Sequence, residues 1–148
     1  MCRWIAYTGQ PIELSKLVHS PVHSLSKQGH STKMNFNTNG ILLQTNGDGH
    51  GVGWYAEGID HPCIVKDEGP IWNNENLKNI CFFTKSHLFM AHVRLTTTGR
   101  VHRENSHPFR HNNWVFQHNG YIGSFPQVRR DLQMDIDPDL YHHLQGTT

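Results

Sequence analysis

The sequence predicts an α+β fold in one domain of 148 residues, and two observations carry this prediction. First, strand-forming segments come early in the chain and helical segments dominate its end, without the regular alternation that builds a parallel sheet. Second, the length falls within the usual size of a single domain, and 36% hydrophobic residues can supply a core.

The first half of the chain is predicted to hold two strands, a short helix and a long loop. Residues 2–8 favour a strand because aromatic and β-branched side chains dominate the run before Gly9. Residues 12–18 favour an amphipathic turn of helix, and residues 20–46 form a polar loop without a clear period. A further short strand is expected over residues 64–66.

Glycine alternates at positions 47, 49, 51 and 53 within the run NGDGHGVGWY. In a strand, this alternation removes the side chains from one whole face. Such a face allows the close approach of another backbone, a packed aromatic ring or a substrate. The spacing matches neither the dinucleotide fingerprint nor a P-loop. Taken alone, a glycine-rich turn into a hairpin explains the run equally well.

The second half is predicted to be richer in helix. Asn73 or Asn74 can cap the first of three helices, and a proline opens the first turn of the other two. The helices are expected over residues 74–81, 124–132 and 137–144. Two strands are expected over residues 88–94 and 114–118, with a loop over residues 96–107 between them.

Charge and cysteine content exclude several classes of function. The formal net charge is +1, so no basic excess marks a nucleic-acid partner. No apolar run approaches the ~20 residues that span a bilayer, and the N-terminus lacks the apolar region of a signal peptide. Three widely spaced cysteines do not make a disulfide framework. We therefore expect a cytoplasmic protein that binds neither nucleic acid nor membrane.

Thirteen histidines raise the question of a metal site. No His-Glu-x-x-His or Cys-x-x-Cys motif is present. His107 and His111 have helical spacing, but Pro108 between them argues against a shared helix face. We expect no metal ligands, and a histidine-rich metal protein stays a third hypothesis that metal analysis of untagged protein would test.

Cys2 directly follows the initiator methionine, and its small side chain suits removal of that residue. The mature chain would then carry an α-amine and a thiol on one residue. Their reference pKa values, about 7.7–8.0 and about 8.5, let the amine take the thiol proton near neutral pH. Taken alone, however, a cysteine in second position carries no partner information and is usually incidental.

Two later features could bind negatively charged oxygen atoms. Arg94 ends a predicted strand beside the hydroxyl groups of residues 96–98, and a guanidinium fork can hold a carboxylate bidentately. A surface salt bridge is the alternative. Asn119-Gly120 is first of all a type I′ hairpin signal, although an Asn amide and a Gly N–H can also converge on an oxyanion.

Five segments stand in a fixed order along the chain: CR at 2–3, NGDGHGVGWY at 46–55, AHVR at 91–94, NSHPF at 105–109 and HNGYI at 118–122. Together they resemble the class II glutamine amidotransferases, which are N-terminal-nucleophile hydrolases. The resemblance is strongest to the branch of the glutathione-degradation amidotransferase-like subunit and the ergothioneine-biosynthesis amidohydrolase. It extends over essentially the whole chain.

The resemblance implies a role for individual residues. Cys2 would be the nucleophile, and Asn119 with Gly120 would form the oxyanion hole. Arg94 would grip the substrate α-carboxylate, with Thr97 as a helper hydroxyl.

The resemblance also gives roles to the glycine run and to the His-Pro-Phe segment at residues 107–109. Gly51 and Gly53 would belong to the glycine-rich wall of the substrate site. Residues 107–109 would be architectural. His50 departs from the family pattern because it stands where Phe or Trp is usual.

The implied activity is hydrolysis of a γ-glutamyl amide, most simply glutamine, through a glutamyl thioester that releases ammonia or an amine. It requires no metal or organic cofactor, and a partner subunit could receive the ammonia. The implied fold is the four-layer αββα sandwich. Residues 146–148 resemble the start of a segment that continues Asp-Ser-Glu, so we expect residues 1–148 to be the N-terminal part of a truncated type 2 domain. The competing hypothesis is a non-catalytic scaffold or partner-binding subunit that keeps the fold.

Overall fold

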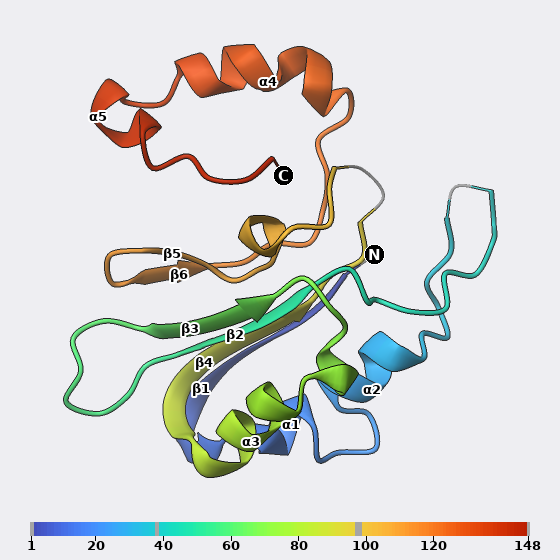
Figure 1. The fold of residues 1–148 in the computed structure, drawn as a ribbon, viewed down its shortest axis with the longest axis vertical. Coiled ribbons are helices and arrows are strands. Elements are labelled where there is room, and N and C mark those ends of the chain that lie inside the picture. The colour runs from blue at the N-terminus through green and yellow to red at the C-terminus, as the bar shows by residue number, and fades with distance from the viewer. Residues whose placement is uncertain (1, 38, 97–98, 148) are drawn as a thin grey trace.

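The computed structural model describes residues 2–37, 39–96 and 99–147 (Figure 1). A four-stranded antiparallel sheet with strand order β1-β4-β2-β3 forms its centre. Its strands are β1 (Arg3–Glu13), β2 (His50–Trp54), β3 (Cys63–Asp67) and β4 (Lys85–Val93). The mixed α/β fold expected from the sequence is therefore confirmed in its broad class.

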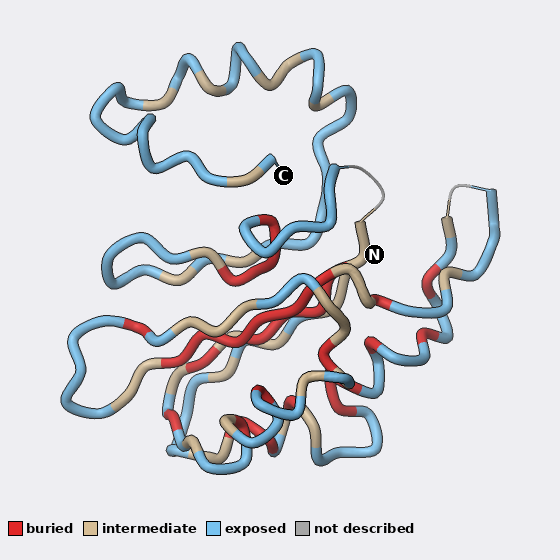
Figure 2. Tube along the Cα trace, viewed as in Figure 1, coloured by how far each residue is buried: buried red, intermediate tan, exposed pale blue. Residues whose placement is uncertain are grey.

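Three helices cover one face of this sheet: α1 (Ser15–Val18), α2 (Leu25–His30) and α3 (Glu75–Phe83), with the 3-10 turn η1 (Ile71–Asn73) beside them (Figure 1). The buried core lies between these helices and the central strands, as Figure 2 shows. Ile5 and Tyr7 of β1 pack against this core, whereas Trp4 is half exposed on the opposite face. The period of two along β1 thus separates a core face from a second face.

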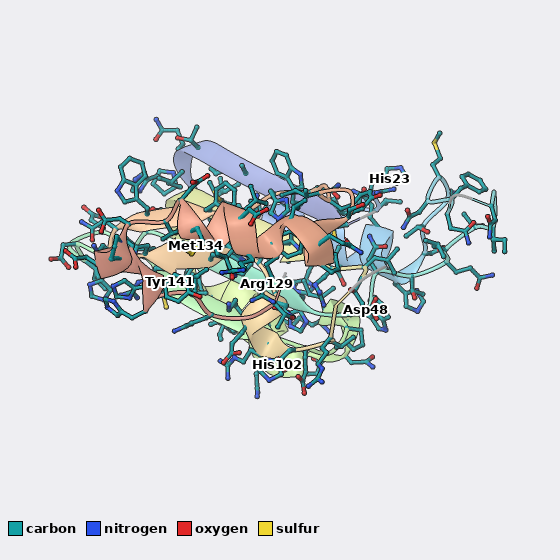
Figure 3. The ribbon with its side chains drawn as sticks, turned by 90° about the horizontal axis from the view of Figure 1, so that it is seen from above. His23, Asp48, His102, Arg129, Met134 and Tyr141 are labelled. Atoms are coloured by element: carbon teal, nitrogen blue, oxygen red, sulfur yellow. The ribbon has the colours of Figure 1, made fainter. Side chains whose placement is uncertain are left out.

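The second face of the sheet carries the hairpin of β5 (Phe109–His111) and β6 (Trp114–Phe116) (Figure 1). Helices α4 (Phe125–Met134) and α5 (Pro138–Tyr141) follow the hairpin and lie beyond it. Figure 3 looks onto α4 from above, with Arg129 and Met134 labelled along it.

The glycine run explains how the chain before the hairpin reaches the sheet so closely. A Cβ atom at Gly51 would overlap the carbonyl oxygen of His107, and one at Gly53 would lie 3.0 Å from Cγ of Pro108. Gly49 has a φ of +131° and faces the Ser106 hydroxyl. Of the neighbours that the alternating glycines admit, the structure shows another backbone against Gly51.

Strand pairing and local capping explain two differences from the predicted elements. The helix expected over residues 12–18 shrinks to α1, because β1 continues to Glu13 and pairs there with Lys85. The loop expected over residues 20–46 contains α2, whose first turn is capped by the Ser24 hydroxyl accepting from Lys27 N at 3.3 Å. The predicted cap of α3 is confirmed, because Asn74 Oδ1 accepts from Leu77 N at 2.9 Å.

The hairpin predicted at Asn119-Gly120 is wrong. The turn of the hairpin instead lies at Asn112 and the residue after it, and Asn112 has a φ of +49°. β6 ends at Phe116, and two of the following side chains bond to the first segment of the chain: Gln117 Nε2 donates to Ile5 O at 2.8 Å, and Asn119 Nδ2 donates to the Cys2 carbonyl, just before β1. The helix expected over residues 137–144 is also shorter, ending at Tyr141.

Candidate active site

The pairing of β1 with β4 places Cys2 beside the end of β4. Arg3 pairs with Val93, so the residue before β1 lies opposite the segment that begins with Arg94. The Cys2 thiol contacts that segment directly, because Leu95 N donates to Sγ at 3.3 Å and Sγ donates to Leu95 O at 3.5 Å. Cys2 is half-buried. The thiol thus lies at the edge of the sheet where β1 begins and β4 ends, near the buried Arg94.

Arg94 follows β4 directly and is 3% exposed. Its Nη1 donates to the carbonyls of Asp48 and Arg100, both at 3.3 Å, and its Nη2 donates to Thr96 Oγ1 at 3.2 Å. Burial lowers the pKa of the guanidinium, while its electrostatic interactions with Cys2 and Asp48 act against that shift. Backbone carbonyls on two sides therefore fix the orientation of the fork.

The turn of the glycine run is bonded to the same segment. Thr96 N donates to Asp48 Oδ2 at 2.9 Å, and Asp48 N donates to Arg94 O at 3.0 Å. Arg94 N in turn donates to Gly49 O at 2.7 Å. The segment carrying Arg94 is thus held by the turn that precedes β2.

Asn119 reaches the nucleophile candidate from the far end of the chain. Its Nδ2 donates to the Cys2 carbonyl at 3.0 Å, and Arg3 Nη1 donates to the same oxygen at 3.2 Å. Gly120 follows on an exposed stretch, with open space where a Cβ would lie. The structure therefore brings Cys2, Arg94 and Asn119 to one place.

The remaining predicted residues lie differently. Gly51 and Gly53 are buried beneath the segment before the hairpin, and a contact with substrate stays a prediction for both. Thr97 lies outside the described residues. Its neighbour Thr96 supplies the hydroxyl that binds Arg94, and sequence reasoning missed this because three threonines stand in a row.

The other two cysteines differ from Cys2 in their surroundings. Cys81 is buried in the core, and this burial raises the pKa of its thiol to about 12. Cys63 is exposed at the start of β3. Cys2, in contrast, is half-buried beside Arg94, and its carbonyl accepts from the Asn119 amide.

Two buried histidines lie under the site on the hairpin face of the sheet. The rings of His92 and His107 stack with centroids 4.4 Å apart, and His118 packs edge-on against His107 at 5.0 Å. Burial lowers the pKa of His92 to about 4 and that of His107 to about 3. Both rings are therefore neutral at neutral pH. The described residues contain no group of three side chains that could hold a metal ion.

Two hollows among the described residues lie away from this site. The larger, of about 600 Å³, borders His50 and Asn74 at the start of α3. Cys2, Arg94 and Asn119 line neither hollow. Among the described residues, no helix is long and apolar enough to cross a membrane.

Comparison with known proteins identifies relatives. The family model of class II glutamine amidotransferases matches residues 29–138. Probable glutamine amidotransferase DUG3 of Saccharomyces cerevisiae is 37% identical over 153 aligned positions, which cover 100% of this chain and 42% of the relative. Gamma-glutamyl-hercynylcysteine sulfoxide hydrolase of Mycobacterium tuberculosis is 28% identical, over 82% of this chain and 50% of the relative.

A solved structure agrees with these matches. The glutamine aminotransferase class-II domain protein of Silicibacter pomeroyi superposes with a TM-score of 0.65 and 28% sequence identity, covering 98% of this chain and 49% of that one. This chain thus spans about half the length of the relatives it matches. Because the family model covers most of the chain, the protein belongs to the class II glutamine amidotransferases.

Proposed function

We propose that this protein hydrolyses a γ-glutamyl amide bond, most simply the side-chain amide of glutamine, with Cys2 as the nucleophile. One observation carries the proposal: the Cys2 thiol contacts the backbone beside buried Arg94, while Asn119 donates to the Cys2 carbonyl. A nucleophile, a carboxylate-binding cation and an oxyanion donor thus come from three distant parts of the chain. The family membership supports an amidotransferase or hydrolase role.

The first half of the reaction uses the α-amine of Cys2 as a base. Removal of Met1 frees this amine, which takes the thiol proton. The thiolate attacks the amide carbon, and the carbonyl oxygen becomes an oxyanion. The second N–H of the Asn119 amide and the backbone N–H of Gly120 stabilise it, and each such donor can contribute ~10²–10³ in rate. The Cys2 ammonium then protonates the leaving nitrogen as the carbon–nitrogen bond breaks.

The second half clears the glutamyl thioester. The Cys2 amine, now neutral, takes a proton from water, and the resulting hydroxide attacks the thioester carbon. The carbon–sulfur bond breaks, the Cys2 ammonium returns its proton to the sulfur, and the γ-carboxylic acid leaves and gives its proton to solvent. These steps require no metal or organic cofactor.

Arg94 selects the substrate in this proposal. A guanidinium has five N–H donors, and three of them serve Asp48, Arg100 and Thr96. The other two can form a fork on the substrate α-carboxylate. The family resemblance gives Thr97, which lies outside the described residues, the role of a helper hydroxyl for this carboxylate.

The two glycines of β2 complete the substrate-binding set. Gly51 and Gly53 belong to the wall of the site and admit the segment before the hairpin close to the sheet. We place the reaction in the cytoplasm, because the reducing conditions there keep the Cys2 thiol free. We also propose that a partner subunit takes up the ammonia.

We also propose the four-layer αββα sandwich as the architecture of the family domain here. Helices α1–α3, the sheet, the hairpin and α4 already follow one another in that order (Figure 1). Apolar side chains on the hairpin and α4 remain exposed, including Trp114, Phe116 and Met134. Further strands beside the hairpin would cover them. A crystal structure of the protein purified from its source tests this, because uncovered side chains there would contradict it.

A scaffold subunit is the second candidate function. It is favoured by one observation: neither of the two hollows described above borders Cys2, Arg94 or Asn119. In that case Cys2 would need no free amine, and retained Met1 would be tolerated.

Ammonia release from glutamine by the full-length protein tests the two candidates. Substitution of Cys2→Ala abolishes turnover if Cys2 is the nucleophile, whereas Cys63→Ala, at an exposed cysteine away from the site, leaves turnover unchanged. Intact mass shows whether Met1 has been removed. Activity that survives in the Cys2→Ala variant rejects the mechanism, and retained Met1 in an inactive protein supports the scaffold.

A further inference from the structure

Asn105 is a buried amide near the Arg94 guanidinium, which we have proposed to bind the substrate α-carboxylate and now call the Arg94 clamp. The proposed reaction does not use Asn105. It ends the 3-10 turn η2 (Arg103–Asn105) and is 1% exposed. Burial of an amide is costly unless its donors and acceptor are bonded. The bonds of Asn105 therefore indicate what holds it there.

The Asn105 amide shares a hydrogen-bond acceptor with the clamp. Its Nδ2 donates to the Arg100 carbonyl at 3.0 Å, and Arg94 Nη1 donates to the same oxygen at 3.3 Å. The carbonyl is thus held between a neutral amide and the guanidinium. Movement of Arg100 would change the orientation of the Arg94 fork.

The same amide also binds a segment from the end of the described chain. Thr147 N donates to Asn105 Oδ1 at 2.7 Å, and Asn105 Nδ2 donates to Thr147 Oγ1 at 3.1 Å. Gly146 has a φ of +75°, and a Cβ there would lie 2.5 Å from Oδ1, so only glycine admits this approach. A Cβ at Gly99 would lie 4.0 Å from both Arg94 Nη2 and Thr147 Oγ1. Asn105 therefore joins three segments around the clamp.

We infer that Asn105 is a positioning residue that sets the orientation of the Arg94 fork and thereby the preference for substrates with a free α-carboxylate. This inference rests on the proposed function. Asn105 acts through the Arg100 carbonyl, which occupies one donor of the guanidinium and leaves the opposite edge for the substrate. Without the amide, the carbonyl is free to move and the fork is no longer aligned.

The test compares glutamine kinetics with a probe that bypasses the clamp. In the full-length protein, Asn105→Ala should raise the KM for glutamine about tenfold and leave kcat within about twofold, because a misaligned Arg94 fork loses about one hydrogen bond to the charged substrate carboxylate. The rate of Cys2 alkylation by iodoacetamide, which has no carboxylate, should stay within about twofold of wild type. The Asn105→Leu variant, which is close in size and loses both donors without adding a charge, should behave alike.

A matched control separates positioning from stability. Asn74→Ala removes the cap of α3, away from the clamp, so it should lower stability and leave the KM unchanged. Three outcomes would overturn this inference and leave the proposed function standing. They are a KM and an alkylation rate that change in parallel, an unchanged KM, and loss of folding in both Asn105 variants. A wild-type protein that does not hydrolyse glutamine would overturn the proposed function, and the inference with it.

Discussion

Gly51 offers a direct test of how the sheet seats the segment that leads to the hairpin. The variant Gly51→Ala adds one methyl group at the second residue of β2. That group would overlap the His107 carbonyl oxygen and would lie 3.1 Å from both the Val65 carbonyl oxygen and Lys66 Cγ. Two of these three neighbours are backbone oxygen atoms, one in β3 and one in the segment before the hairpin. Backbone atoms cannot rotate away as a side chain does, so β2 or one of these two segments must shift.

The expected loss of stability follows from this geometry. Overpacking a buried site costs about 1–3 kcal/mol, and rigid backbone neighbours place Gly51→Ala at the upper end of that range. The alanine also stiffens the unfolded chain, which offsets roughly 0.4–1 kcal/mol. We therefore expect the free energy of unfolding to fall by about 2 kcal/mol, which moves the urea midpoint down by about 1 M.

Gly29→Ala is the matched control for this experiment. The nearest atoms to a Cβ at Gly29 are the Val93 methyl groups at 3.5 Å, an ordinary contact, and the residue lies within α2. Alanine in a helix should raise stability there by about 0.5–1 kcal/mol. The two variants thus differ in sign, as measured by urea unfolding followed by tryptophan fluorescence. A Gly51→Ala protein as stable as wild type would refute the packing of this segment.

Three further predictions concern the site and its pH dependence. Burial lowers the pKa values of His92 and His107 to about 4 and about 3, whereas the unfolded chain titrates near 6.5. The unfolded state therefore binds more protons below that value, so stability is complete above pH 6.5 and each histidine removes about 2 kcal/mol by pH 5. Urea midpoints that do not change between pH 7.5 and pH 5 would contradict this. The variant Arg94→Lys should lower kcat/KM for glutamine about tenfold or more, because a point charge cannot replace a fork, and unchanged kinetics would count against the clamp. The variant Asn119→Ala should reduce kcat by ~10²–10³ with a nearly constant KM, and a selective rise in KM would instead make Asn119 a binding residue.

Features that depend on neighbouring residues could be predicted from the sequence. Alternating glycines predicted a bare strand face, and Asn74 predicted the start of α3, because both signals depend on neighbouring residues. The six-residue helix α2 was missed since it is too short to show a hydrophobic period. The turn of the hairpin was predicted at Asn119 but lies at Asn112. Asparagine suits a positive φ at either position, and the sequence does not show the long-range bond that ties Asn119 to Cys2.

The candidate site was predicted by residue type and chain order, not by geometry. Cys2, Arg94 and Asn119 were identified from the sequence, and the register of β1 with β4 brings the first two together. No local pattern encodes that register. Asn105 was recognised only as part of a motif, since its bonds to Arg100 and the distant Thr147 become visible only in three dimensions.

The most direct test of this account is covalent labelling by a diazoketone analogue of glutamine, read by intact and peptide mass spectrometry. We predict one adduct per chain, located on Cys2 of protein that has lost Met1, formed in parallel with the loss of glutaminase activity and prevented by excess glutamine. Processed protein that stays unlabelled at Cys2, or that is labelled equally at exposed Cys63, would contradict the assignment of the nucleophile.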